Sequence, residues 1–152
     1  MNKKIVILPL LILSLFILTA CTSNNYDSKK LGKVQAGEVS PKADKIEVFY
    51  FHSTARCTTC LAIGRLTNET VAEYFQPELR DGKIEVREVN IELPENKEIA
   101  KKFQASGSSL YLNTIYDNQD HISEDATVWR LSSNPEQFKS YLKNKIEKQL
   151  GK

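Results

Sequence analysis

The spacing of hydrophobic positions changes several times along the chain, and each change predicts a different element. Residues 46–51 are apolar and aromatic, which predicts a strand that is buried on both faces toward its end. Over residues 58–75 apolar side chains recur at near-helical spacing, which predicts a helix. Residues 83–92 alternate between apolar and polar, as in a strand. The alternation shifts phase between Val86 and Val89, which indicates either a bulge or burial of both faces.

The second half of the chain predicts two helices around a hairpin. A helix with acidic residues in its first turn begins at Pro94, and Gly107 lies just past its end. A turn rich in Asp and Asn separates two further strands. A proline at the first helical position then opens the last helix, which carries a regular apolar stripe. The strands are expected at residues 110–115 and within 121–131, and the last helix at 135–150.

The expected order is therefore β-α-β-α-β-β-α, an α/β fold with a mixed central sheet flanked by helices. The first β-α-β unit implies parallel strands joined by a right-handed crossover. The final β-β-α unit adds an antiparallel hairpin and a covering helix.

The first twenty residues have the layout of a secretory signal peptide. A short basic segment, residues 1–4, precedes an almost entirely apolar run over 5–20. The run ends in Leu18-Thr19-Ala20-Cys21, which resembles the lipobox of bacterial lipoproteins. That resemblance implies that Cys21 is acylated, attaches to membrane lipid and begins the mature protein. The alternative is an uncleaved membrane anchor, because the run approaches the ~20 residues that span a bilayer.

Either interpretation places the folded part outside the cytoplasm, held to a bacterial cell membrane. Residues 21–44 contain few large apolar side chains and predict a flexible tether, so the folded domain is expected at 45–150. The formal charge of +2 comes from Lys3 and Lys4, which leaves the mature part neutral. This balance gives no reason to expect a nucleic acid partner.

Cys57 and Cys60 stand where the first strand passes into the first helix. Because Cys21 is assigned to lipid, they form an isolated pair, and outside the cytoplasm they are expected to be oxidised at least part of the time. The helix N-terminus and Arg56 favour a thiolate at Cys57. We therefore expect Cys57 to be the attacking thiol and Cys60 the resolving thiol, with no cofactor.

Two other interpretations of the pair remain open. One is an inert disulfide in a non-catalytic domain. The other is a module that binds a soft metal or arsenic(III) through Cys57 and Cys60, although two thiolates supply only half of a tetrahedral site.

Residues 45–150 resemble the thioredoxin-like superfamily. The resemblance is carried by Val48-Phe49-Tyr50-Phe51-His52 leading into Cys57-Thr58-Thr59-Cys60, and by Val89-Asn90-Ile91 followed by residues 99–107. It implies that the C-x-x-C pair is a redox site at the first strand-to-helix junction.

Within that superfamily the chain resembles a smaller bacterial and archaeal family, the nitrophenyl compound nitroreductase subunit of the arsenical-resistance type. Tyr50-Phe51-His52, Arg56-Cys57-Thr58-Thr59-Cys60 and Pro94-Glu95-Asn96-Lys97 carry this resemblance. It implies electron transfer toward nitroaromatic or organoarsenical compounds. It also implies a protein redox partner of the transmembrane thiol-reductant carrier type.

Two positions depart from the thioredoxin pattern. Ser109 takes the place of a cis-proline at the entry to the third strand, and we expect a trans bond there because a cis bond before serine costs about 3 kcal/mol. Phe51 takes the place of a buried carboxylate that assists proton transfer, six residues before the first cysteine. We therefore expect weaker thiol exchange by the usual acid–base route.

Three supporting residues complete the expected site. His52 either fills space at the strand end or exchanges protons with Cys60 in place of the missing carboxylate. By resemblance to the superfamily, Ser108 and Ser109 are expected to hydrogen-bond a partner strand through their backbone.

Overall fold

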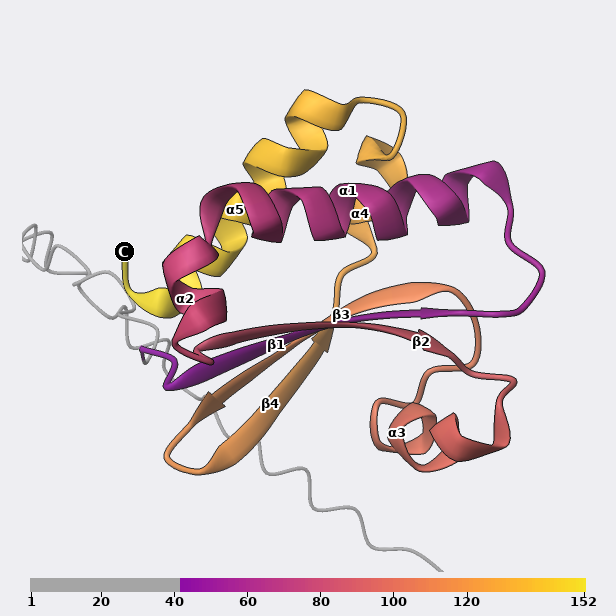
Figure 1. The fold of residues 1–152 in the computed structure, drawn as a ribbon, viewed down its shortest axis with the longest axis horizontal. Coiled ribbons are helices and arrows are strands. Elements are labelled where there is room, and N and C mark those ends of the chain that lie inside the picture. The colour runs from indigo at the N-terminus through magenta and orange to yellow at the C-terminus, as the bar shows by residue number, and fades with distance from the viewer. Residues whose placement is uncertain (1–41) are drawn as a thin grey trace, which may run out of the picture. The chain divides into compact units, whose positions relative to one another are not determined.

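The computed structural model describes residues 42–152, which form a four-stranded sheet with helices on both faces (Figure 1). The strands are β1 (Lys45–His52), β2 (Ile84–Asn90), β3 (Ser109–Tyr116) and β4 (Gln119–Glu124). The helices are α1 (Thr58–Tyr74), α2 (Gln76–Arg80), α3 (Lys97–Lys102), α4 (Thr127–Leu131) and α5 (Pro135–Leu150), with a 3₁₀ turn, η1 (Pro94–Asn96), before α3. The expected signal peptide, Cys21 and most of the expected tether lie outside the described residues.

The sheet has the strand order β2-β1-β3-β4. β1 pairs with β2 in parallel, whereas β3 runs antiparallel to both β1 and β4. The prediction of a mixed α/β sheet with a parallel first unit and an antiparallel hairpin is confirmed. Within residues 42–152, no helix combines the length and apolar character needed to cross a membrane.

Two apolar clusters hold the sheet, one on each face. Ile46, Val48 and Tyr50 of β1 pack with α1, α4 and α5 in the larger cluster. Phe49 and Phe51, which point the other way, pack against α3 in the smaller cluster. Figure 1 shows the same division, with α1 and α5 on one side of the sheet and α3 on the other. The alternation along β1 thus places every second side chain under α1.

The phase shift in β2 reflects burial on both faces. Its pairing with β1 runs without interruption from Ile84 to Asn90, so the strand has no bulge. Ile84 and Val86 contact the larger cluster, whereas Val89 belongs to the smaller one. Of the two alternatives, a bulge or burial of both faces, burial of both faces is therefore the correct one.

The strand expected within residues 121–131 occupies only the first part of that range. β4 ends at Glu124, and residues 127–131 form α4 instead. Asp125 explains the change: its buried carboxylate accepts the N–H of Thr127 at 3.0 Å, the hydroxyl of Tyr141 at 3.0 Å and the ammonium of Lys145 at 2.8 Å. These contacts turn the chain off the sheet and tie it to α5.

The folded residues begin before Lys45. Ala43 is buried, and its N–H donates to the carbonyl of Gln149 at 2.9 Å. The N–H of Asp44 donates to the carbonyl of Ile115 at 2.8 Å. These two residues, which were expected in the tether, thus belong to the fold.

Candidate functional site

Cys57 and Cys60 form a disulfide at the amino end of α1, just beyond the carboxyl end of β1. Their Cα atoms are 5.0 Å apart. Cys57 is the N-cap of α1, and its sulfur accepts the N–H of Cys60 at 3.1 Å. Cys57 is exposed, whereas Cys60 is only 7% exposed. A reacting group therefore reaches the sulfur of Cys57 first, and the helix amides around that sulfur favour a thiolate.

Tyr50 lies beneath the disulfide. Its hydroxyl donates to the carbonyl of Cys60 at 2.7 Å, and its side chain is almost fully buried. Burial raises the pKa of Tyr50 above its ordinary value, and hydrogen bonding with Arg56 and Ser108 offsets part of that rise. Tyr50 therefore remains a hydrogen-bond donor at neutral pH, and Ser108 lies within hydrogen-bonding reach of it.

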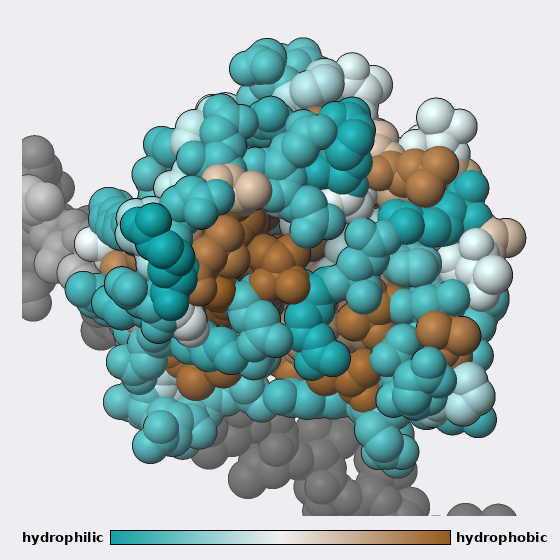
Figure 2. Space-filling model, viewed as in Figure 1, coloured by the Kyte–Doolittle hydropathy of each residue, from teal (hydrophilic) through white to brown (hydrophobic). Residues whose placement is uncertain are grey.

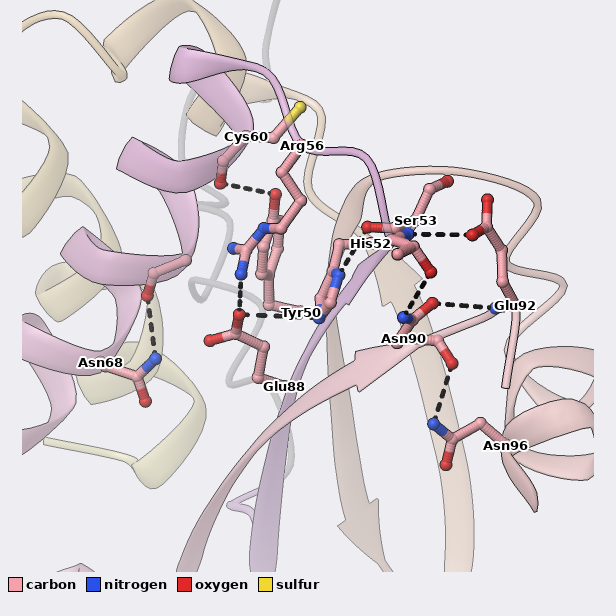
Figure 3. A network of polar contacts seen from close by, with 12 residues as sticks. Tyr50, His52, Ser53, Arg56, Cys60, Asn68, Glu88, Asn90, Glu92 and Asn96 are labelled. Carbon is pink, nitrogen blue, oxygen red and sulfur yellow. Dashed lines mark hydrogen bonds and ion pairs between the residues drawn. The ribbon is translucent and has the colours of Figure 1, made fainter. Parts of the chain in front are cut away.

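Arg56 points inward and is bound to the neighbouring strand. Its guanidinium lies 5.4 Å from the ring centre of Tyr50 and forms an ion pair with Glu88 of β2 (Figure 3). Its side chain is only 19% exposed. The charge expected to act on Cys57 is thus balanced by a carboxylate.

The space for Arg56 exists because residue 64 of α1 is glycine. A Cβ atom there would lie 2.8 Å from Nη2 of Arg56 and 2.9 Å from Cε1 of Tyr50. Sequence reasoning missed both Gly64 and Glu88. A glycine inside a helical pattern was an available signal for the first. Glu88 gave no such signal, because only the pairing register brings it opposite Tyr50.

His52 contacts Glu88 instead of the cysteines. Its Nε2 lies 3.6 Å from Oε1 of Glu88, and its Nδ1 is 2.9 Å from the carbonyl oxygen of Ser53. In the part of the chain that the structure describes, no hydrogen bond joins His52 to Cys57 or Cys60. Proton exchange between His52 and Cys60 stays a prediction.

The loop between β1 and Cys57 is tied to the chain that follows β2. Asn90 donates from Nδ2 to the hydroxyl of Thr54 at 2.9 Å, and its Oδ1 accepts the N–H of Glu92 at 3.0 Å. The carboxylate of Glu92 accepts the N–H of Thr54 at 3.1 Å. Hydrogen bonds from Thr54 hold the pKa of Glu92 below its usual value. The same contacts are drawn in Figure 3.

Phe51, the residue at the position of the superfamily's buried carboxylate, does not lie under the disulfide. It faces the smaller cluster, with its ring centre 5.3 Å from that of Phe103 and 5.6 Å from that of Tyr111. The side chain that occupies the space beneath the cysteines is Tyr50, one residue earlier. A strand exposes alternate residues to opposite faces, so a position count alone does not identify the group beneath the pair.

The entry to β3 agrees with the expected trans bond. No peptide bond between residues 42 and 152 is cis. Ser109 is buried and pairs with Phe51 of β1, and its hydroxyl donates to the carbonyl of Gly107 at 3.4 Å.

The described residues do not complete a metal site around the cysteines. Over positions 42–152, no three His, Cys, Asp or Glu side chains are placed to hold a metal ion together. A metal bound by the two thiolates would need its remaining ligands from outside these residues.

The surface offers little continuous apolar area on the side drawn in Figure 2. That face is mostly hydrophilic, and its hydrophobic atoms appear in separate patches. The large hydrophobic side chains exposed within 42–152 are Leu61, Tyr74 and Leu93. Leu61 directly follows Cys60 and therefore belongs to the rim of the disulfide.

The strand order, the parallel first unit and the cysteine pair at the end of β1 define a thioredoxin-like fold. A C-x-x-C disulfide at this junction suits thiol–disulfide exchange. No protein-family model and no curated protein sequence matches the chain.

Several solved structures are similar to this chain in fold. A thioredoxin from Thermus thermophilus is 16% identical, with a TM-score of 0.43, and the match covers 69% of this chain and 76% of that one. Thioredoxin O2 from Arabidopsis thaliana in its oxidized state is 22% identical, with a TM-score of 0.40, and the match covers 65% and 81%. The germline-specific thioredoxin Deadhead from Drosophila melanogaster is 15% identical, with a TM-score of 0.42 and coverage of 66% and 81%.

Proposed function

We propose that this protein is a thiol–disulfide oxidoreductase or electron-transfer protein that cycles Cys57 and Cys60 between disulfide and dithiol. The observation that carries the proposal is the exposed residue Cys57 at the amino end of α1, joined by a disulfide to the buried Cys60. An accessible sulfur at a helix N-terminus with a resolving cysteine one turn inward has the geometry needed for exchange.

The exchange proceeds through a mixed disulfide. In the reduced protein the Cys57 thiolate attacks one sulfur of a substrate disulfide, forms a new S–S bond and releases one substrate thiolate. Cys60 then loses its proton and attacks the sulfur of Cys57, which releases the second substrate thiolate. Two electrons pass to the substrate, its thiolates take up two protons, and the protein returns to the disulfide form.

The proposed location is a bacterial cell membrane, to which lipid on Cys21 would hold the domain on a side that faces outside the cytoplasm. The lipobox-like Leu18-Thr19-Ala20-Cys21 supports this placement. About twenty residues separate Cys21 from the folded part, and a flexible chain of that length has an end-to-end distance on the order of 25 Å. Such a tether would let the domain reach a protein embedded in the same membrane.

The proposed partner is a transmembrane carrier of thiol reductants, which would restore the dithiol by exchange with its own thiols. The motifs shared with the nitrophenyl compound nitroreductase subunit family support nitroaromatic or organoarsenical compounds as final acceptors. The pair itself accounts for the electron transfer and does not select among these acceptors.

The decisive experiment measures the reduction potential of the full-length protein in detergent and traps its mixed disulfide. We expect a potential between about −120 and −270 mV, the range of exchanging thioredoxin-like proteins. Cys60→Ser should accumulate a mixed disulfide at Cys57, and Cys57→Ser should abolish exchange. The matched control is Cys21→Ser, which should keep exchange in detergent and lose membrane attachment.

Two outcomes would contradict the proposal. A potential below about −300 mV without any mixed disulfide would identify an inert bridge. Stoichiometric metal or arsenic(III) on the reduced protein, lost in Cys57→Ser and found without exchange activity, would identify a binding module.

A further inference from the structure

Arg56 and Glu88 form an ion pair beside the disulfide. This ion pair alters the effect of the arginine charge on Cys57. Arg56 is the residue immediately before Cys57, so an unbalanced guanidinium there would favour the thiolate. In the structure its Nη1 is bound to Oε1 of Glu88. Over residues 42–152, Glu88 is the only carboxylate in an ion pair with Arg56.

The surroundings fix this pair in place. The guanidinium is held over the ring of Tyr50 from β1, and on the side of α1 it lies so close to Gly64 that a Cβ atom there would be 2.8 Å from Nη2. Two titratable side chains of β1 also face Glu88: His52, with its Nε2 at 3.6 Å, and Tyr50, which is paired with Glu88 in the register of the two strands. Arg56 is thus confined between β1, β2 and α1, with its charge opposed by one side chain.

We infer that Glu88 is a positioning residue that acts through Arg56 to restrain thiolate formation at Cys57 and so sets the balance between disulfide and dithiol. Glu88 does not touch the reacting sulfur. It offsets the positive charge that would otherwise stabilise the thiolate. The inference concerns the site of the proposed function and rests on it for its consequence in exchange, whereas the ionisation of Cys57 can be measured without any exchange.

Removing the charge of Glu88 and removing the charge of Arg56 should shift the pKa of the Cys57 thiol in opposite directions. Without the charge of Glu88, a net positive charge remains next to Cys57, and the pKa of its thiol falls. Without the charge of Arg56, a net negative charge remains, and that pKa rises. An opposite charge within about 4–6 Å shifts a pKa by roughly 1–3 units. Because the guanidinium is turned toward Tyr50 and Glu88 and the site is partly exposed to solvent, we expect a shift of about one unit or less.

A lower thiol pKa stabilises the reduced protein. The dithiol form gains the favourable ionisation of Cys57, whereas the disulfide form has no proton to lose. Glu88→Gln should therefore make the pair easier to reduce and Arg56→Gln should make it harder.

The test uses the full-length protein in detergent and compares Glu88→Gln, Arg56→Gln and the double variant. The alkylation rate of Cys57 against pH reports its thiolate fraction. We expect Glu88→Gln to raise that rate between about threefold and tenfold at a pH below the midpoint. Arg56→Gln should lower it, and the double variant should return close to wild type, as a coupled pair requires.

The same variants, equilibrated with glutathione, report the potential. A tenfold shift toward the dithiol in Glu88→Gln corresponds to about 30 mV. Glu88→Asp, which keeps the carboxylate, should keep most of the wild-type reduction potential. Glu92→Gln is the matched control, because Glu92 holds the same loop through Thr54 but is not paired with Arg56. Glu92→Gln should lower the free energy of unfolding, but its alkylation rate of Cys57 against pH should stay much closer to that of wild type.

The directions in which the two variants shift the ionisation of Cys57 decide whether the inference holds. Shifts in the same direction for Glu88→Gln and Arg56→Gln, or no shift in either folded variant, would overturn the inference and identify the pair as a purely structural contact. Opposite shifts without any mixed disulfide would support the inference and contradict the proposed exchange. Thermal unfolding of each variant establishes that the comparison is made on folded protein.

Discussion

Gly64 lies on the face of α1 that packs against β1, and its missing side chain leaves room for two others. A Cβ atom at this position would come within 3.0 Å of both Arg56 and the ring of Tyr50. The guanidinium could move toward solvent, but the tyrosine ring is buried in the larger cluster and cannot. The close packing under the disulfide therefore depends on this glycine.

Gly64→Ala is expected to destabilise the protein although alanine is the better helix former. Alanine should gain about 1 kcal/mol of helix propensity, whereas overpacking against Tyr50 costs about 1–3 kcal/mol. We expect a net loss on the order of 1 kcal/mol in the free energy of unfolding, measured by urea denaturation. Gly107→Ala is the control, because no atom lies within 4 Å of its added Cβ. A more stable Gly64→Ala variant would show that the contact relaxes freely.

Tyr50 makes the fold sensitive to alkaline pH. Burial raises its pKa in the folded protein, so between the ordinary value near 10 and that raised value the unfolded chain loses a proton that the folded chain keeps. Stability from this group is complete below about pH 10 and falls as pH rises through the window. Tyr50→Phe should be less stable than wild type at neutral pH, by about 1 kcal/mol for the lost hydrogen bond.

The pH series separates this effect from general alkaline unfolding. Between about pH 9 and pH 11 the urea midpoint of wild type should fall further than that of Tyr50→Phe. Tyr116→Phe, on the outer hairpin, controls for the loss of any one tyrosine. Parallel decreases in wild type and Tyr50→Phe would mean that Tyr50 does not contribute.

The sequence was enough to select Cys57, Cys60 and Arg56 but not the residues that surround them. A C-x-x-C pair at a strand-to-helix junction is typical of a redox site, and its residues are adjacent in the chain, so local spacing identified it. Glu88 is 32 residues from Arg56 along the chain. Its role depends on the parallel register of β1 and β2, which no local pattern specifies. The same limit applies to Tyr50, because the alternation of β1, and not a count back from Cys57, identifies it as the side chain beneath the disulfide.

At the scale of elements, the order of strands and long helices along the chain was predictable, and the short helices were less so. A continuous apolar run marked β1, alternation marked β2, and turn residues marked the β3–β4 hairpin. α4 was missed because a buried side chain, Asp125, organises it, and local spacing does not report burial. α3 ends at Lys102, earlier than expected, and Gln104 then adopts a left-handed conformation with φ 54°.

Asn90 joins two loops at the carboxyl end of β2, and its removal should loosen the loop before Cys57. Asn90→Ala loses the contacts to Thr54 and to the N–H of Glu92, so we expect a loss of about 1–2 kcal/mol in stability. Amide hydrogen exchange should become faster in residues 53–56. Asn68→Ala is the control, because Asn68 contacts only the carbonyl of Gly64 within its own helix. Unchanged exchange at 53–56 would show that the two remaining contacts, Glu92 with Thr54 and Glu88 with Arg56, hold the loop without Asn90.

At the scale of the whole molecule, the two apolar clusters lie on opposite faces of one sheet, and neither requires the disulfide. Cys60 is not a member of either cluster, and the bond to Cys57 spans a sequence separation of 3. Such a short loop restricts the unfolded chain less than a long loop would. A redox protein needs this independence, because both oxidation states must stay folded.

We therefore expect the reduced protein to remain folded, with a free energy of unfolding lower than that of the oxidised form by about 2 kcal/mol, the chain-entropy value for so short a loop. Urea denaturation with and without a thiol reductant measures the difference, and near-ultraviolet circular dichroism should show that tertiary packing is retained. The Cys57→Ser/Cys60→Ser double variant should behave like the reduced protein under both conditions, because it has no bond to break. If reduction unfolded the domain while the double variant stayed folded, reduction itself and not the loss of the cross-link would be responsible. If both unfolded, the bridge would be structural, since a domain that depends on its disulfide cannot release it in every turnover.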